Sequence, residues 1–295
     1  MGAEFKSRGY NIGAFDAATA SDVLSGSGLS SSAAFEVLLG TILNHLFNDG
    51  KVSDVEIAQI AQAAENKFFG KPCGLLDQMT SSVGSFVEID FADPANPVIE
   101  KLDFDFASCG YALCIVDTGG SHSDLTDEYA AVRKEMESVA EYLGKSVLRE
   151  VDEDEFMKNI ADIRSSCGDR AVLRAMHFYG DNARVEKQAA ALKAGDFETF
   201  KKYIIESGRS SYMYNQNVYS CKKASEQPVS LALSLSEKLL DGCGAWRVHG
   251  GGFAGTIQAF VPLNKLDEYK DLMEKVFGSG SCYILSVRPV GGVEL

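Results

Sequence analysis

A Gly/Ser-rich stretch at residues 25–34 holds residue types well suited to bind an anion. It reads Ser-Gly-Ser-Gly-Leu-Ser-Ser-Ser-Ala-Ala and leads into residues 31–47, which are apolar nearly all round and predict a mostly buried helix. A helix N-terminus presents unpaired N–H groups and a positive dipole end, and glycines let the backbone approach a phosphate closely. The stretch therefore predicts a phosphate-binding loop. The alternative is an ordinary Gly/Ser-rich helix cap.

A second helix is predicted to follow, because Ser53 and Glu56 have the spacing of a capping box and Gly70 and Pro72 end the pattern. Its apolar stripe comprises Ile57, Ile60, Ala61, Ala64 and Phe68.

Later segments predict strands and then a helix-rich half. Strands are expected around residues 87–91 and 102–106, joined by a Pro-containing turn, and at 111–116. Helices are expected at 125–143, 169–193, 196–207, 229–240 and 265–277, and further strands at 253–261 and 282–287. This order favours an α+β fold. We place a lobe boundary near Ser108, which divides the chain into residues 1–108 and 109–295.

The composition excludes several classes of protein. The 295 residues are 45% hydrophobic, enough for a sizeable core and two lobes. Because 42 acidic residues outnumber 28 basic ones, giving a net charge of −14, nucleic acid and anionic membranes are not expected partners. The 7 cysteines show no C-x-x-C pair and the 4 histidines show no ligand spacing, so no zinc site is expected. No apolar run approaches the roughly 20 residues of a membrane span or a signal core, and we expect a cytoplasmic protein.

Four stretches together resemble galactokinases of the GHMP small-molecule kinase superfamily. Residues 28–33, Gly-Leu-Ser-Ser-Ser-Ala, resemble the GHMP phosphate motif, and residues 64–78 are similar to the galactokinase stretch that contains the catalytic aspartate. Residues 116–133 are similar to the segment entering the second lobe, and residues 246–255 resemble the third GHMP motif, a glycine turn. The order of the four stretches is that of the family.

This resemblance implies a fold and an activity. The fold would be an α+β, GHMP kinase-like two-lobe structure, with an incomplete first lobe like domain 2 of ribosomal protein S5 and a ferredoxin-like, helix-rich second lobe. The activity would be ATP-dependent phosphorylation of galactose at the C1 hydroxyl, with Mg²⁺ as the metal. Phosphoryl transfer of this kind depends mainly on positioning and charge neutralisation.

The resemblance also implies roles for individual residues. Asp77 would be catalytic, orienting or deprotonating the sugar hydroxyl. Ser31 and Glu65 would hold magnesium, and Gly74, Asp77 and Tyr129 would bind the sugar. The residues expected to bind ATP are Gly26, Ser27, Gly28, Leu29, Ser30, Ser31, Ser32, Gly250, Gly251 and Gly252.

Each assignment has a structural alternative. Glu65 could be a solvated glutamate on an exposed helix face, and Asp77 could cap a helix after Gly74. Tyr129 lies on the apolar stripe of its own helix and could belong to the core. The glycines at 250–252 could form a tight turn between strands.

The first motif of galactokinases, which resembles G-R-V-N-L-I-G-E-H-T-D-Y, is absent from this sequence. By resemblance it supplies an arginine beside the catalytic aspartate, acidic groups for the sugar and strands of the first lobe. We therefore expect an uncovered sheet edge and core face, open to self-association or to a partner chain. An internal start, a partner that supplies the missing piece, or a degenerate protein would each explain the departure. The alternative functions are an inactive relative that binds nucleotide or sugar and a GHMP kinase for another small-molecule alcohol.

Overall fold

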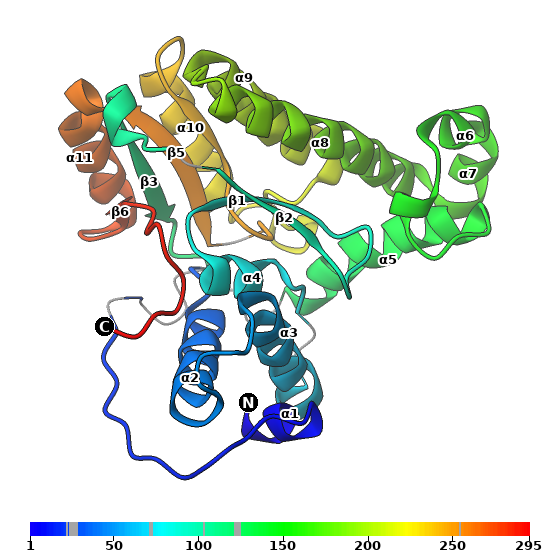
Figure 1. Cartoon of the computed structure of the whole chain (residues 1–295). Coiled ribbons are helices and arrows are strands. Elements are labelled where there is room, and N and C mark those ends of the chain that lie inside the picture. Colours follow the sequence, from blue (N-terminus) through cyan, green and yellow to red (C-terminus); the bar gives the residue numbers. More distant parts are fainter. Residues whose placement is uncertain (22, 24–28, 71–72, 103, 121–124, 254) are drawn as a thin grey trace. The chain divides into compact units, whose positions relative to one another are not determined.

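The computed structural model describes residues 1–295 apart from positions 22, 24–28, 71–72, 103, 121–124 and 254 (Figure 1). The chain forms two compact units. The first comprises Met1–Asp103 together with Val287–Leu295, and the second comprises Phe104–Ser286. The assignment of residues 1–108 and 109–295 as two kinase lobes stays a prediction.

The first unit consists of helices and one hairpin. The helices are α1 (Gly2–Ser7), α2 (Ser31–Asn48), α3 (Asp54–Ala64) and α4 (Leu76–Val83), with a π-helical turn at Glu65–Phe69 after α3. Strands β1 (Phe86–Asp90) and β2 (Val98–Leu102) pair antiparallel. The predicted helices after residues 31 and 53 are confirmed.

The capping box that begins α3 is confirmed. The Ser53 hydroxyl accepts a hydrogen bond from the Glu56 amide at 3.3 Å, and the Glu56 carboxylate accepts one from the Ser53 amide at 3.4 Å. This reciprocal pair satisfies two N–H groups that would otherwise lack partners at the helix end.

The core of the first unit lies between its helices and against the hairpin. One cluster joins α1, α2 and α3 and contains Phe5, Val37, Leu43, Val52, Ile57, Ile60 and Ala61. A second joins α3 and α4 to the hairpin and contains Ala58, Leu75, Met79 and Val83, with Val87, Ile89 and Ile99 packed against it. The hydrophobic periodicity of α3 is thus explained by burial.

Two details of the predicted pattern are wrong. Phe68 lies on the predicted apolar stripe but is 62% exposed, because the helix becomes π-helical at Glu65 and the extra residue per turn rotates later side chains off the stripe. The predicted strand at 102–106 ends at Leu102, since Phe104 and Phe106 join an aromatic cluster of the second unit.

The C-terminal segment completes the first unit. The Ser85 amide donates to the Arg288 carbonyl at 2.8 Å. A Cβ atom at Gly291 would lie only 1.7 Å from the Ser82 carbonyl oxygen, so the close approach of this segment to α4 requires glycine.

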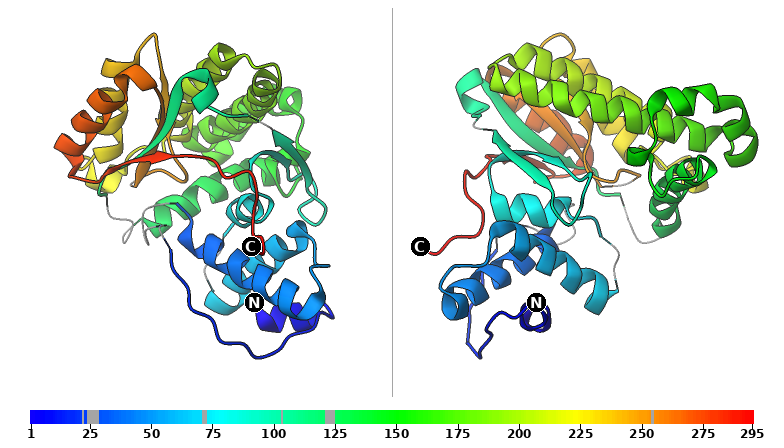
Figure 2. Two further views of the ribbon diagram at one scale, coloured as in Figure 1. Left: turned by 60° about the vertical axis from the view of Figure 1, so that its left-hand side comes forward. Right: turned by 45° about the vertical axis from the view of Figure 1, so that its right-hand side comes forward.

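The second unit is built on an antiparallel sheet with the strand order β4-β5-β3-β6 (Figures 1 and 2). The strands are β3 (Tyr111–Asp117), β4 (Ala245–Val248), β5 (Thr256–Pro262) and β6 (Cys282–Leu285). Helices α10 (Pro228–Leu240) and α11 (Leu266–Phe277) cover one face, and α9 (Phe197–Ser210) packs on the other. The core beneath α10 and α11 includes Val229, Ala232, Tyr269 and Met273 with Cys114, Val116, Ile257 and Ala259 of the sheet.

The remaining helices extend from this sheet as an arm. They are α5 (Thr126–Tyr142), α6 (Glu153–Lys158), α7 (Ile160–Cys167) and α8 (Asp169–Lys193), and a π-helical turn at Ser211–Asn215 follows α9. The predicted helices at 125–143, 169–193, 196–207, 229–240 and 265–277 are confirmed. The predicted strand at 253–261 begins only at Thr256, and sequence analysis missed α1, α4, α6, α7 and β4, which are short.

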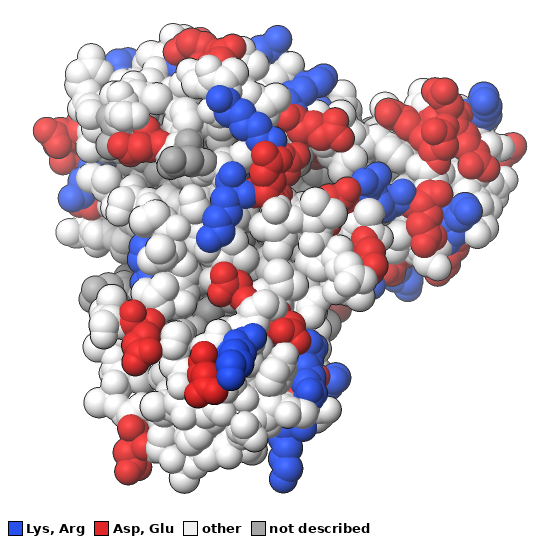
Figure 3. All heavy atoms as spheres, viewed as in Figure 1, with Lys and Arg blue, Asp and Glu red and all other residues white. Residues whose placement is uncertain are grey.

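Charged side chains of both signs are scattered over the face shown in Figure 3, and acidic groups gather at the α6–α7 end of the second unit. The first turn of α6 supplies Glu153, Asp154 and Glu155. In the part of the chain that the structure describes, no helix is long and apolar enough to cross a membrane.

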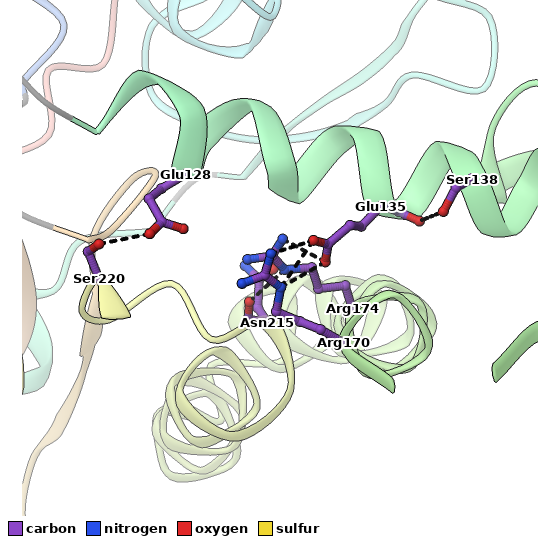
Figure 4. Close-up of polar contacts among 7 residues, drawn as sticks. All are labelled: Glu128, Glu135, Ser138, Arg170, Arg174, Asn215 and Ser220. Atoms are coloured by element: carbon purple, nitrogen blue, oxygen red, sulfur yellow. Dashed lines mark hydrogen bonds and ion pairs between the residues drawn. The ribbon is translucent and has the colours of Figure 1, made fainter. Parts of the chain in front are cut away.

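A buried ionic network holds the arm together (Figure 4). Arg174 on α8 has no exposed side-chain surface; its Nη1 donates to Glu135 Oε2 on α5 at 2.8 Å and its Nε to the Asn215 carbonyl at 3.0 Å. Arg170 donates to the same carboxylate. Two cations therefore share Glu135, which links α5 and α8.

Candidate active site

The serine at the N-cap position of α2, Ser30, does not cap the helix with its side chain. Ser30 has φ of 56° and ψ of 44°, and its side chain makes no capping hydrogen bond. Instead Ser30 Oγ donates a hydrogen bond to Asp77 Oδ2 at 2.7 Å. The Ser30 side chain therefore leaves the first-turn N–H groups of α2 uncapped, as an anion-binding helix end requires. Gly26, Ser27 and Gly28, which were also expected to bind ATP, lie outside the described residues.

Asp77 is the exposed partner in this contact. It is the second residue of α4, whose N-cap residue, Leu75, makes no side-chain capping bond. The alternative of Asp77 as a helix cap therefore finds no support. The contact brings together two predicted site residues that are far apart in the sequence. The other carboxylate oxygen of Asp77, Oδ1, can accept a hydrogen bond from a second donor.

Glu65 is buried, not solvated. Its side chain begins the π-helical turn and the residue is only 4% exposed. Oε1 accepts a hydrogen bond from Ser32 Oγ at 3.4 Å, and Oε2 accepts one from Gln78 Nε2 at 2.9 Å. The interpretation of Glu65 as a solvated surface residue is wrong. The serine that reaches it is Ser32, while Ser31 opens the helix.

Gln78 organises this cluster, and sequence analysis gave it no role. It is 1% exposed, and besides Glu65 its Nε2 lies 3.3 Å from Glu36 Oε2. A buried amide that donates to two carboxylates holds both in place. The available signals were its position next to Asp77 in the matched block and the four-residue spacing of Ser32 and Glu36 along α2.

Cys73 and Gly74 precede α4. Burial, followed by the hydrogen bond and charge of Glu65, raises the pKa of Cys73 to about 11, so its thiol is neutral near pH 7. Gly74 is exposed, and a Cβ added there would meet no atom within 4 Å. Its backbone φ is not positive, so local structure does not require glycine at this position.

The oxygen ligands offered by Glu65 and Ser32 meet only part of the needs of a hard cation. Glu65 supplies carboxylate oxygens and Ser32 a hydroxyl, both oxygen ligands of the kind that Mg²⁺ prefers. Within the described ranges no group of three or more His, Cys, Asp or Glu side chains could hold a metal ion. The residues therefore fit Mg²⁺ bound jointly with phosphate and water, not in an all-protein cage.

The remaining predicted site residues lie in the second unit. The Tyr129 hydroxyl donates to the Gly252 carbonyl at 2.7 Å, and its ring meets that of Phe253 edge-on at 5.4 Å. A Cβ at Gly251 would lie 2.7 Å from the Tyr129 ring, and one at Gly252, where φ is +78°, would lie 1.9 Å from the Asn217 carbonyl oxygen. The tight-turn interpretation thus accounts for these two glycines, and packing accounts for much of Tyr129. Their predicted ligand contacts stay predictions.

Three comparisons with known proteins bear on this geometry. Residues 3–85 match the family described as GHMP kinases N terminal domain. A galactokinase from Actinobacillus pleuropneumoniae is 31% identical over 258 residues, covering 88% of this chain and 64% of the relative. The human galactokinase is 32% identical over 281 residues, covering 95% of this chain and 68% of the relative. The chain thus spans about two-thirds of the length of these relatives.

A solved structure agrees in fold. The crystal structure of Lactococcus lactis galactokinase complexed with galactose superposes with a TM-score of 0.76 at 23% identity, covering 99% of this chain and 74% of that one. The predicted α+β fold of the GHMP kinase type is confirmed.

Proposed function

The chain belongs to the galactokinase family of GHMP kinases, and we propose that it phosphorylates galactose at the C1 hydroxyl with ATP as the phosphoryl donor. The observation that carries this proposal is the 2.7 Å hydrogen bond between Ser30 and Asp77 at the start of α2, where the side chain of the N-cap residue Ser30 makes no capping bond. It sets a helix end suited to phosphate beside a carboxylate suited to accept a proton. The relatives named as galactokinases, and the galactose bound in the solved one, support galactose as the sugar.

The nucleotide phosphates are proposed to lie at the start of α2. The amides and hydroxyls of Ser30, Ser31 and Ser32 would hold them, with Leu29 and the Gly26–Gly28 residues completing the loop and Gly250, Gly251 and Gly252 as the second glycine element. Ser31 and Glu65 are the proposed protein ligands of Mg²⁺, and we add Ser32 because its hydroxyl contacts Glu65. When bound, magnesium neutralises charge on the transferred phosphoryl group.

Asp77 is proposed to act on the sugar. Its Oδ2 is engaged by Ser30, and its Oδ1 would accept the proton of the C1 hydroxyl as that oxygen attacks the γ-phosphorus and ADP leaves. Gly74 would let the sugar approach the backbone before α4, because a Cβ at this position would meet no described atom within 4 Å. Tyr129 is the proposed sugar contact from the second unit.

A coupled ADP-release assay with galactose tests this proposal on the wild-type chain, on Asp77→Asn and on Asp49→Asn. Asparagine can still accept the Ser30 hydrogen bond, so Asp77→Asn should keep its melting temperature while kcat falls by about 10²- to 10⁴-fold. Asp49, an exposed aspartate paired with Lys51, is the matched control and should lose no activity. Equal rates for Asp77→Asn and wild type would refute the role of Asp77.

The same preparations separate the alternative functions. Turnover with mevalonate or homoserine but not galactose would assign a different GHMP substrate. A rise in melting temperature with ATP and Mg²⁺, without turnover of any alcohol, would identify a binding protein, since a ligand of the native state raises apparent stability. Either outcome would overturn the galactose kinase proposal.

We also propose that the first unit associates with another polypeptide through α2. Phe35, Leu38 and Leu46 fall on one stripe of this helix and are 49%, 40% and 57% exposed. Light scattering after size exclusion should show a dimer or a heteromeric complex that Leu38→Glu disrupts. A monomer at every concentration, together with no captured partner, would contradict this.

The cytoplasm remains the proposed compartment. All 7 cysteines are unpaired in the structure, as expected under reducing conditions. Cell fractionation with an antibody to the chain would test the assignment, and recovery outside the cytoplasm would refute it.

A further inference from the structure

Gln78 on α4 donates hydrogen bonds to two carboxylates from different helical segments. Its Nε2 lies 2.9 Å from Glu65 Oε2, in the π-helical turn after α3, and 3.3 Å from Glu36 Oε2 on α2. An amide nitrogen carries two hydrogens, so one Gln78 side chain can serve both acceptors. Gln78 therefore connects three helical segments of the first unit through a single nitrogen atom.

The orientation of the Gln78 amide follows from its neighbours. A third contact of Nε2 is Cys73 Sγ at 3.6 Å. If the amide were turned over, Oε1 would face the acceptor oxygens of Glu36 and Glu65 and would be repelled by them. In the observed orientation Oε1 is buried, and it has no hydrogen-bond partner among the residues that the structure describes.

Packing alone does not explain an amide at this position. Gln78 is 1% exposed, and a buried amide oxygen without a donor is unfavourable. A methionine would fill a similar volume without a group that requires a donor. The presence of glutamine is therefore better explained by the carboxylates that Nε2 holds than by the stability of the core.

Gln78 and Ser32 together orient the carboxylate of Glu65. Oε1 of Glu65 accepts from Ser32 Oγ at 3.4 Å, and Oε2 accepts from Gln78 Nε2. Each carboxylate oxygen can accept more than one interaction, so these two bonds fix the plane of the carboxylate and leave it capacity for a cation. Groups that orient a metal ligand in this way typically change metal affinity by about 10- to 100-fold when they are removed.

We propose that Gln78 is a positioning residue for magnesium and acts through the carboxylate of Glu65. This inference rests on the proposed function, in which Glu65 is a ligand of Mg²⁺. Gln78 follows Asp77 in the first turn of α4, where Asp77 is exposed and Gln78 is buried. One short helix thereby positions both the proposed proton acceptor and the amide that holds the metal ligand.

The test measures metal binding to the full chain without galactose and without turnover. Mn²⁺ serves as the probe, because it prefers the same oxygen ligands as Mg²⁺. Isothermal titration calorimetry gives the affinity for a non-hydrolysable ATP analogue with Mn²⁺ and, in EDTA, without metal. The ratio of the two affinities is the gain due to the metal. Gln78→Met should reduce this gain by about 10- to 100-fold and leave the affinity for the metal-free analogue unchanged.

Further variants locate the effect. Gln59→Met is the matched control, since it makes the same substitution at an α3 amide that donates to the Ala95 carbonyl, and it should leave the gain unchanged. Glu65→Gln should lose most of the gain. Adding Gln78→Met to Glu65→Gln should cause no further loss, because Gln78 acts only through Glu65. Gln78→Asn keeps an amide that is too short to reach Glu65, and it replaces Gln78→Met if that variant does not fold.

The possible outcomes are distinct. An unchanged gain in Gln78→Met would overturn the inference and leave the proposed galactose phosphorylation intact. Equal losses of affinity with and without metal would assign Gln78 a purely structural role, and a further loss in the double variant would show that it acts by another route. No gain from the metal in the unmodified chain would overturn the magnesium site of the proposed function, and this inference with it.

Discussion

The buried network around Glu135 allows a direct test of how burial changes the contribution of an ion pair to the free energy of unfolding. Glu135 and Glu137 lie two residues apart on α5, and each carboxylate receives an arginine. The arginine that Glu135 binds, Arg174, has no exposed side-chain surface, whereas Arg133, the partner of Glu137, is 81% exposed. We expect Glu135→Gln to be far more destabilising than Glu137→Gln.

The magnitude follows from solvation. Removing one partner of a buried ion pair costs about 3–5 kcal/mol, because the other charge is left uncompensated. Glu135 is itself 22% exposed, and glutamine can still accept one hydrogen bond, so we expect about 3 kcal/mol for Glu135→Gln. For Glu137→Gln we expect less than about 1 kcal/mol. In a unit of this size these values correspond to a decrease in melting temperature of about 6–12 °C and of about 4 °C or less.

Urea denaturation followed by tryptophan fluorescence measures this difference. Trp246 is the single tryptophan of the chain and is 7% exposed in the core of the second unit, so its emission reports on the unit that contains the network. Losses of unfolding free energy that agree within about 0.5 kcal/mol would refute the reasoning, since they would mean that the Arg174 charge is solvated.

Three further predictions concern the first unit. Gly74→Ala should keep its melting temperature, because the new Cβ meets no atom within 4 Å, but should raise the galactose KM by about tenfold or more in the coupled assay. Iodoacetamide at pH 8 should alkylate exposed Cys221 well before Cys73, whose pKa is raised to about 11, as peptide mass spectrometry would show. The Tyr10 hydroxyl donates a hydrogen bond to the Glu56 carboxylate at 2.6 Å and lowers the pKa of Glu56. This bond stabilises the folded state above the ordinary glutamate pKa of about 4.3. The stabilisation is lost as the pH falls through the lowered pKa. Tyr10→Phe should therefore reduce the unfolding free energy more at pH 7 than at pH 2.5, as measured by urea denaturation.

Each of these has a contrary result. An unchanged KM in Gly74→Ala would mean that the sugar does not approach that backbone. Early labelling of Cys73 would show that its thiol is open to solvent or ionised. Equal losses in Tyr10→Phe at both pH values would remove the charge of Glu56 from the explanation.

Local signals in the sequence predicted much of the fold. The Ser53–Glu56 capping box begins α3 as expected, since both of its hydrogen bonds form within four residues. The long helices were predictable because their apolar periodicity reflects burial on one face. Short elements such as β4 were missed, because four residues provide too little pattern to distinguish a strand from the glycine motif that follows.

The site was predictable in composition but not in its contacts. The matched block pointed to Glu65 and Asp77, yet only the folded chain shows that Ser30 reaches Asp77 and that Gln78 holds Glu65. The exposure of Phe68 depends on a π-helical turn that no residue pattern announced. Contacts of this kind depend on how helices pack against one another. The local sequence around each side chain contains no pattern that predicts them.

The return of Val287–Leu295 to the first unit affects how the protein is made. Glu294 pairs with His45 on α2 at 3.1 Å, and Gly291 packs on Ser82, so these contacts need residues that the ribosome adds only after the entire second unit. During synthesis the surfaces of α2 and α4 that this segment covers stay exposed until it has been made. Exposed surface of this kind favours chaperone binding and aggregation in that interval.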